Sequence, residues 1–199
     1  MKLRYSPTSP YVRKVVVFAK ETGLDPRIEF VATTTGVTSD LAKQNPLGKV
    51  PALIADDGTA IYDSPVILEY LDALNPGPKL IPASGPARWK ALIGQALADG
   101  IMDAAVLRRG EVLRPQHVQS ADFLGKQAAV CASGLDTLER EVEALASPIT
   151  VAQISVGCAL GYLDFRFASD EWRKSRPKLA AWFEAFNARP SMSSTVPKG

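Results

Sequence analysis

The chain has 199 residues, of which 46% are hydrophobic and 22% charged, as is usual for a globular protein with one large or two small domains. Its net charge of +2 is small and its basic residues are scattered, so no nucleic-acid partner is expected. No apolar run approaches the length that crosses a bilayer, so no membrane association is expected. The first residues lack the apolar stretch of a secretory signal.

Cys131 and Cys158 are the only cysteines, and both lie in apolar segments of helical pattern. Neither a metal-ligand spacing nor a disulfide framework is present. We therefore expect no metal, and a cytoplasmic location, where thiols stay reduced. His117 is the only histidine, which excludes chemistry based on paired imidazoles.

Strand and helix patterns alternate along the first part of the chain. The expected strands lie at residues 2–5, 28–31, 52–55 and 60–62. The expected helices lie at residues 10–22, 40–44 and 65–74. The resulting order, β-α-β-α-β-β-α, predicts a four-stranded sheet with helices on both faces.

Pro51 stands directly before the third expected strand, where the ladder needs an N–H group that proline lacks. A cis Val50–Pro51 bond is one explanation for this position. It would turn the N–H and C=O of Val50 away from the sheet. Those groups can then pair with the backbone of an extended peptide, as an added strand does.

Ser64 is followed by Pro65, a combination typical of a helix N-cap and first turn. A helix start also offers free N–H groups to a carboxylate. Together with Val50, this helix start predicts a groove that grips a small extended peptide by its main chain and its acidic end.

Residues 76–84 are rich in proline and glycine, which indicates a linker between a first domain, residues 1–75, and a second, residues 85–199. No convincing strand pattern follows the linker. Apolar residues instead trace a helical stripe from Trp89 to Ala104.

Three more helices are expected after that stripe. Apolar residues repeat at alternating spacings of four and three over residues 124–145, which fits a short coiled-coil seam but favours one face of a bundle helix. Thr150 and Gln153 form a capping-box pattern, which predicts an almost wholly apolar, buried helix ending near Phe167. The last expected helix opens at Pro177.

With these elements in order, the chain closely resembles the cytosolic glutathione transferases of the bacterial type over nearly its full length. The resemblance is carried by SPYVR at residues 9–13, NPLGKVP at 45–51, DSPVI at 63–67 and the helix start at Thr150. Each motif alone is weak, but four in the correct order are specific. The resemblance implies a thioredoxin-like N-terminal domain that holds glutathione as co-substrate. It also implies an all-α helical-bundle domain that completes the site for a small hydrophobic electrophile.

The family resemblance further implies a homodimer, a detoxification role and a catalytic position at Ser9. Glutathione reacts as its thiolate, and the Ser9 hydroxyl can donate a hydrogen bond to that sulfur at the positive end of the first helix. The family carries Ser, Cys or Tyr at this position. The alternative is that Ser9 is only an N-cap, and Thr8 and Ser6 are neighbouring candidates for the same role.

Four further residues resemble family positions that bind glutathione. The backbone of Val50 would pair with the cysteine of glutathione, and Lys49 would approach its glycine carboxylate. Asp63 would accept from the γ-glutamyl ammonium group, and Ser64 would present its hydroxyl and N–H to the γ-glutamyl carboxylate. Many family members carry Glu or Gln where this chain has the shorter Asp63. The alternative interpretations are that Lys49 is only solvated, that Val50 is only a buried residue at a strand start, and that Asp63-Ser64 is an ordinary helix start.

Acidic and basic residues on the first helix of the second half have open roles. Asp99 and Asp103 lie one turn apart on the same side, which fits an acid/base pair but favours a solvated or inter-subunit face. In the family that the chain resembles, an acid on this helix sometimes reaches the ligand of the partner subunit, and Asp99 is the candidate for that role. Arg108 and Arg109 form a charged helix face, although one arginine can attract anionic substrates. Residues that can line the electrophile pocket, or simply pack in the core, are Met102, Val106, Tyr162 and Phe165.

The leading hypothesis is an enzyme that activates glutathione and transfers it to a small electrophile. The second is glutathione-dependent reduction of a peroxide or disulfide. Dithiol exchange is excluded, because Ser6-Pro7-Thr8-Ser9 stands where thioredoxins carry Cys-x-x-Cys. The third is a non-catalytic interaction protein of the same fold, which would need neither Val50-Pro51 nor Asp63-Ser64.

Overall fold

The computed structural model describes residues 1–146 and 148–197. The first part of the chain forms a four-stranded sheet in the order β2-β1-β3-β4. Its strands are β1 (Lys2–Tyr5), β2 (Glu29–Ala32), β3 (Ala52–Ile54) and β4 (Ala60–Ile61). β1 pairs with β2 in parallel, whereas β3 is antiparallel to both β1 and β4. These strands lie within one or two residues of the expected bounds.

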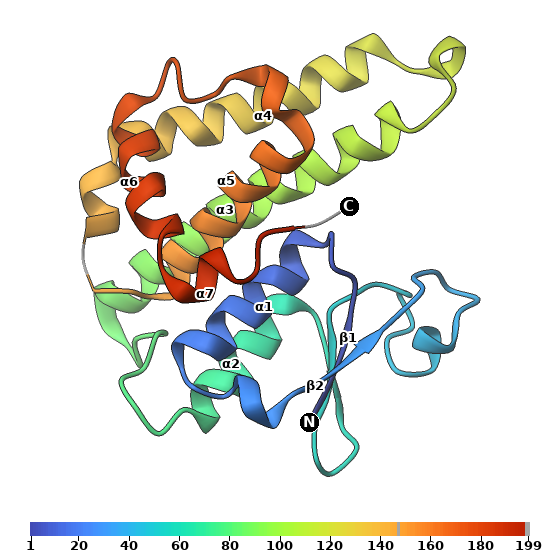
Figure 1. Ribbon diagram of the computed structural model, residues 1–199, viewed down its shortest axis with the longest axis vertical. Coiled ribbons are helices and arrows are strands. Elements are labelled where there is room, and N and C mark those ends of the chain that lie inside the picture. Colours follow the sequence, from blue (N-terminus) through green and yellow to red (C-terminus); the bar gives the residue numbers. More distant parts are fainter. Residues whose placement is uncertain (147, 198–199) are drawn as a thin grey trace.

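Helices α1 and α2 lie together on one side of this sheet (Figure 1). The helical segments of this half are α1 (Pro10–Glu21), η1 (Asp25–Arg27), η2 (Asp40–Lys43) and α2 (Ser64–Leu74). Leu3 of β1 is fully buried, and the alternation of a strand sends the next residue, Arg4, to the other face. There Arg4 Nη2 lies 2.6 Å from Asp40 Oδ2, so η2 lies on that second face.

The short helix expected at residues 40–44 is therefore a 3-10 helix, so the second face of the sheet carries a single 3-10 turn where the first carries two α-helices. The physical reason is local. Pro46 disfavours the α conformation at Asn45, so a helix begun at Asp40 has no room to grow.

The second half of the chain is helical, and its described residues contain no strand. Its α-helices are α3 (Gly85–Val112), α4 (Ala121–Arg140), α5 (Val151–Phe167), α6 (Pro177–Asn187) and α7 (Pro190–Ser193). Three 3-10 turns connect them, namely η3 (Gln116–Val118), η4 (Val142–Ala146) and η5 (Ala168–Asp170). Among the described helices, none combines the length and the hydropathy needed to cross a membrane.

Two expectations for this half need correction. The apolar repeat of residues 124–145 does not form one continuous helix, because α4 ends at Arg140 and the remaining positions belong to η4. The helix opened by Pro177 is not the last one, because Pro190 starts the one-turn helix α7. A four-residue helix lacks the length for a periodic apolar pattern, which is why the sequence did not reveal it.

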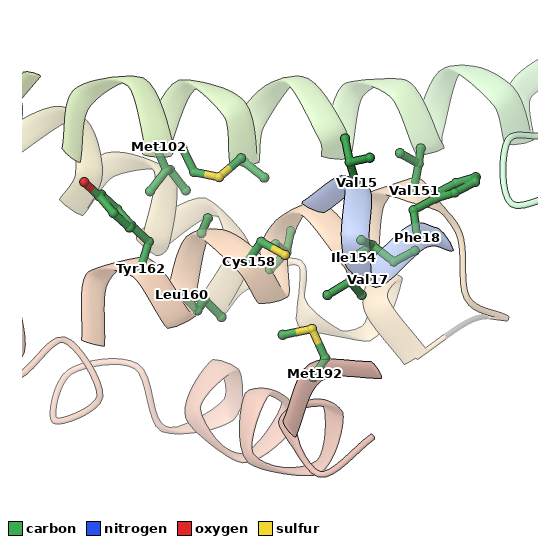
Figure 2. Packing of buried hydrophobic residues seen from close by; sticks show 14 of the residues in the cluster. Val15, Val17, Phe18, Met102, Val151, Ile154, Cys158, Leu160, Tyr162 and Met192 are labelled. Atoms are coloured by element: carbon green, nitrogen blue, oxygen red, sulfur yellow. The ribbon is translucent and has the colours of Figure 1, made fainter. Parts of the chain in front are cut away.

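Helix α5 forms the centre of the core, as the capping box predicts. Thr150 and Gln153 make both hydrogen bonds of that motif, and the helix they open is buried from Val151 to Leu163. Figure 2 shows its side chains packed between α3 on one side and Met192 of α7 on the other.

Helices α3 and α5 run side by side in the same direction. Near their starts, a Cβ atom on Gly94 would lie 2.7 Å from the Cβ of Ala152. Near their ends, the Arg108 guanidinium lies 4.1 Å from the centre of the Phe167 ring. Residues at corresponding levels along the two helices are therefore neighbours.

Helix α1 is held by contacts from the second half of the chain. Arg13 donates from Nη2 to the carbonyl of Met192 at 3.0 Å. At the other end of α1, the Glu21 carboxylate accepts from Arg189 and Ser191. These bonds tie the segment around α7 to α1, and they fix the helix whose first turn follows Ser9.

Candidate active site

The strand register brings three of the predicted site segments to one edge of the sheet. Arg4 of β1 pairs with Ala52 of β3, so continuing the register places Val50 beside the chain that leaves β1 toward Ser9. Leu53 pairs with Ile61 of β4, so the same continuation places Pro51 level with Asp63. We call this the site edge: the residues that follow β1, precede β3 and follow β4.

The Val50–Pro51 bond is cis, which confirms the explanation offered for Pro51. No hydrogen bond from the N–H or C=O of Val50 to the described residues is formed. Its partly buried side chain packs against the core. The main chain of Val50 is therefore free to pair with a ligand.

Asn45 supports the turn that carries Val50. Its side-chain Nδ2 donates to the carbonyl of Lys49 at 2.8 Å, and its Oδ1 accepts from the amide of Leu47 at 3.1 Å. Asn45 is only 2% exposed, so these bonds are shielded from water. The sequence analysis missed this role, although an Asn-Pro pair before a glycine is a recognisable turn signal.

Gly48 holds the same turn against the loop after β2. Its φ of +62° favours glycine, and a Cβ atom there would lie 2.3 Å from the backbone carbon of Gly36. The amide of Gly36 donates to the carbonyl of Gly48 at 2.8 Å. Nothing larger than glycine fits this contact, so the two loops are locked together.

Ser9 is the N-cap of α1, and its Oγ accepts a hydrogen bond from the amide of Val12 at 3.3 Å. This bond uses the oxygen as an acceptor and leaves the hydroxyl proton available for donation. The hydroxyls of Ser6 and Thr8 lie 3.5 Å apart and face each other. The capping and catalytic interpretations of Ser9 are thus compatible.

Asp63, not Ser64, occupies the N-cap position of α2, which corrects the expected helix start by one residue. The Asp63 side chain is exposed and makes no capping bond. Ser64 is 2% exposed, and its hydroxyl and amide make no hydrogen bond with the described residues. A hydroxyl without an internal partner, on a largely buried residue at a helix start, is suited to an anionic ligand.

Lys49 is exposed, and its ammonium makes no ion pair within residues 1–146 and 148–197. The structure thus brings Ser9, Lys49, Val50, Asp63 and Ser64 to one edge of the sheet, with Lys49 and Asp63 at its solvated rim.

Two polar contacts join the first turns of α1 to α3, close behind Ser9. The Tyr11 hydroxyl donates to the Asp103 carboxylate, and burial together with that carboxylate raises the pKa of Tyr11. Lys14 is completely buried, and its Nζ lies 2.6 Å from Asp99 Oδ1. Burial raises the pKa of Asp99, and the Lys14 charge opposes that shift. The sequence analysis missed Tyr11 and Lys14, because their partners are distant along the chain.

Asp99, the candidate for reaching a partner's ligand, is therefore engaged by Lys14 of its own chain. The Asp99 side chain is only 19% exposed, so the intramolecular ion pair accounts for its position.

The chain's own thiols are buried. Cys131 and Cys158 are unpaired, and burial raises the pKa of Cys158 to about 11. Burial likewise raises the pKa of Cys131. Neither thiol is therefore suited to act as a nucleophile. In the part of the chain that the structure describes, no group of three or more potential ligands is arranged to hold a metal ion.

Comparison with known proteins identifies the class that this fold and site define. The N-terminal domain of glutathione S-transferases matches residues 8–74, and the C-terminal domain matches residues 96–185. The chain belongs to the glutathione S-transferase family.

Particular members of that family resemble the chain over its full length. The uncharacterized GST-like protein YibF of Escherichia coli is 36% identical over 99% of this chain and 98% of its own. Glutathione S-transferase 3 of Zea mays is 28% identical over 98% of this chain and 93% of its own. The crystal structure of a family member from Pseudomonas fluorescens Pf-5, with bound glutathione, superposes with a TM-score of 0.96. It is 47% identical and covers 100% of this chain and 99% of its own.

Proposed function

We propose that this protein is a glutathione transferase that activates the glutathione thiolate and conjugates it to a small hydrophobic electrophile. The observation that carries this proposal is the convergence at the site edge. The hydroxyl of Ser9, the unbonded main chain of Val50 and the free amide of Ser64 stand at three segments that the strand register aligns. Such an edge can bind an extended tripeptide along its main chain.

Ser9 would stabilise the thiolate. Its proton is free because its oxygen already accepts from Val12, and the start of α1 adds a positive dipole. Lowering the pKa of the glutathione thiol raises the fraction of nucleophile near neutrality. The chain's own cysteines are buried and take no part.

The remaining predicted site residues would hold the rest of glutathione. The main chain of Val50 would pair with its cysteine, and Lys49 would approach its glycine carboxylate. Ser64 would bind the γ-glutamyl carboxylate at the start of α2, and the exposed Asp63 would accept from the adjacent ammonium.

Ligands of solved relatives support this proposal. The Pseudomonas fluorescens family member is described with glutathione, and in a second structure with S-(propanoic acid)-glutathione. A relative from Methylobacillus flagellatus, 39% identical with a TM-score of 0.92, also holds glutathione. The second ligand is an S-conjugate, which is the kind of product that the proposed reaction forms.

The proposal assigns glutathione binding to residues 1–75 and completion of the electrophile site to residues 85–199. We also propose a homodimer. Three exposed apolar side chains of α2 and α3 are suited to contact a second copy, namely Val66 (50% exposed), Trp89 (62%) and Ile93 (67%). The two unpaired cysteines support a cytoplasmic location, and conjugation of small electrophiles would serve detoxification.

Activity toward a chlorinated nitroaromatic and toward a mixed disulfide of glutathione tests the function. We expect conjugation of the aromatic compound by the native protein, with kcat/KM about 100-fold lower in Ser9→Ala. Ser9→Gly should lose a similar factor, although glycine is a tolerated N-cap. Thr8→Ala should retain most activity.

Other outcomes would redirect the proposal. Reduction of the mixed disulfide without conjugation would favour the glutathione-dependent reductase. Failure to be retained on immobilised glutathione would favour a non-catalytic interaction protein.

A further inference from the structure

Two arginines lie near each other where α3 and α5 run in parallel. Arg109 lies on α3 and Arg166 on α5, close to the level at which Arg108 meets Phe167. Both side chains are partly buried. Arg166 lies on the ring of Phe165, with its Cζ 3.9 Å from the ring centre.

Neither guanidinium is paired with a carboxylate. The neighbouring Arg108 binds Asp170, and Arg173 binds Asp164, so these two acids are already engaged. Within residues 1–146 and 148–197, no carboxylate oxygen lies within 4.0 Å of Arg109 or Arg166. The Nε atom of Arg166 is buried without a hydrogen-bond partner. Partly buried cations without anions indicate a site that an external anion completes.

Tyr162 lies on α5, the helix that also carries Arg166. Burial raises the pKa of Tyr162, while a hydrogen bond from Arg166 and the charges of Arg166 and Arg109 oppose that shift. Figure 2 shows the Tyr162 ring at the edge of the core, with its hydroxyl directed away from the packed cluster. Arg166 follows Tyr162 by one helical turn, or about 6 Å along α5.

The charges of Asp103, Arg109 and Arg166 also determine how a charged substrate would be oriented. Tyr11 lies two residues after Ser9, and its hydroxyl contacts the carboxylate of Asp103. A negative group on a substrate is repelled at Asp103 and attracted at Arg109 and Arg166. An anionic electrophile would therefore place its reactive carbon toward Ser9 and its charge toward the two arginines.

We propose that Arg109 and Arg166 bind a carboxylate on the electrophile, so that the enzyme prefers substrates that carry a negative charge. This inference rests on the proposed transferase function and specifies its substrate class. In a substitution on a halogenated aromatic acid, the glutathione sulfur forms a bond to the ring carbon. The halide leaves with the electron pair of the carbon–halogen bond, and the carboxylate serves only for binding.

The test compares two ligands that differ by one carboxylate, S-benzylglutathione and S-(4-carboxybenzyl)glutathione. We expect calorimetry to show about tenfold tighter binding of the carboxylated conjugate to the native protein at low salt. The preference should disappear in the double variant Arg109→Gln/Arg166→Gln, while the affinity for S-benzylglutathione stays the same. Arg27→Gln removes an exposed arginine elsewhere and should retain the preference.

Two results would overturn the inference. The first is equal affinity of the native protein for both conjugates. The second is a carboxylate preference that survives in the double variant. If glutathione and S-benzylglutathione bind but the preference is absent, only this inference fails. If glutathione itself does not bind, the proposed function fails as well, so the two failures are distinguishable.

Discussion

The site edge and helix α5 use their polar groups in opposite ways. At the site edge, the main chain of Val50 and the hydroxyl of Ser64 have no partner among the described residues. At the start of α5, Thr150 and Gln153 satisfy each other's free groups, and the following residues are buried in apolar contacts.

This difference separates binding from stability within one small protein. A helix that closes its own hydrogen bonds and buries its surface stabilises the fold but offers nothing to a ligand. An edge with free donors and acceptors contributes little to stability and is completed by a ligand. Substitutions in the two regions should therefore have separable effects on unfolding and on glutathione binding.

The largest effect on stability is expected at the boundary between the two halves. Asp99→Asn leaves the fully buried ammonium of Lys14 without its anion, which typically costs about 3–5 kcal/mol. The free energy of unfolding in urea measures this loss. Asp122→Asn is the control, because Asp122 pairs with Lys126 in solvent and should cost less than about 1 kcal/mol. Equal small costs for both variants would contradict the role of the buried pair.

Ile154→Ala tests the packed region alone. Ile154 is fully buried on α5, and truncating it should lower the free energy of unfolding by about 2–5 kcal/mol through lost burial and an unfilled cavity. The affinity of the remaining folded protein for glutathione should not change. Leu113→Ala, at a residue that is 66% exposed, should cost less than about 0.5 kcal/mol. A large loss of glutathione affinity in Ile154→Ala would remove the distinction between the regions.

Ser64→Ala tests the site edge alone. Removing this hydroxyl should weaken glutathione binding by about tenfold, because a hydrogen bond to a charged group is worth roughly 1.5 kcal/mol. The matched control is Ser120→Ala at the N-cap of α4, where Ser120 Oγ accepts from Phe123 N at 3.2 Å. That control should cost about 1 kcal/mol of stability without changing glutathione affinity. The reverse pattern, in calorimetry and urea unfolding, would contradict the assignment of Ser64.

The smallest effect concerns the attachment of the C-terminal segment to α1. Hydrogen bonds from Arg189, assisted by Ser191, lower the pKa of Glu21. A lowered pKa in the folded state stabilises the fold above the unfolded-state pKa, near 4.3, and this stability is lost as pH falls through the folded-state value. Glu21→Gln should therefore cost about 1 kcal/mol at pH 7, since Arg189 is partly solvated, and little at pH 3. A cost that does not depend on pH would contradict the ion pair.

Much of the fold and part of the site could be predicted from local sequence signals. The capping box at Thr150 and the proline before β3 act over a few residues, so single-sequence patterns reveal them. The α-helix expected at residues 40–44 failed because the pattern is too short to separate an α-helix from a 3-10 turn.

Contacts between distant residues could not be predicted in the same way. Lys14 and Asp99 are 85 positions apart, and Tyr11 and Asp103 are 92 positions apart. Their pairing depends on how α1 packs against α3, which no local pattern encodes. Arg109 is likewise indistinguishable in sequence from its paired neighbour Arg108, and only the packing of α3 against α5 separates their roles.

The ionisation of bound glutathione tests the central claim most directly. The ultraviolet absorbance of the thiolate, followed against pH in the presence of saturating glutathione, gives the pKa of the bound thiol. We predict a value about one to two units below that of free glutathione in the native protein, and a return toward the free value in Ser9→Ala and Ser9→Gly. A bound thiol that titrates like free glutathione, or a lowered pKa that survives both substitutions, would contradict the role of Ser9 at the site edge.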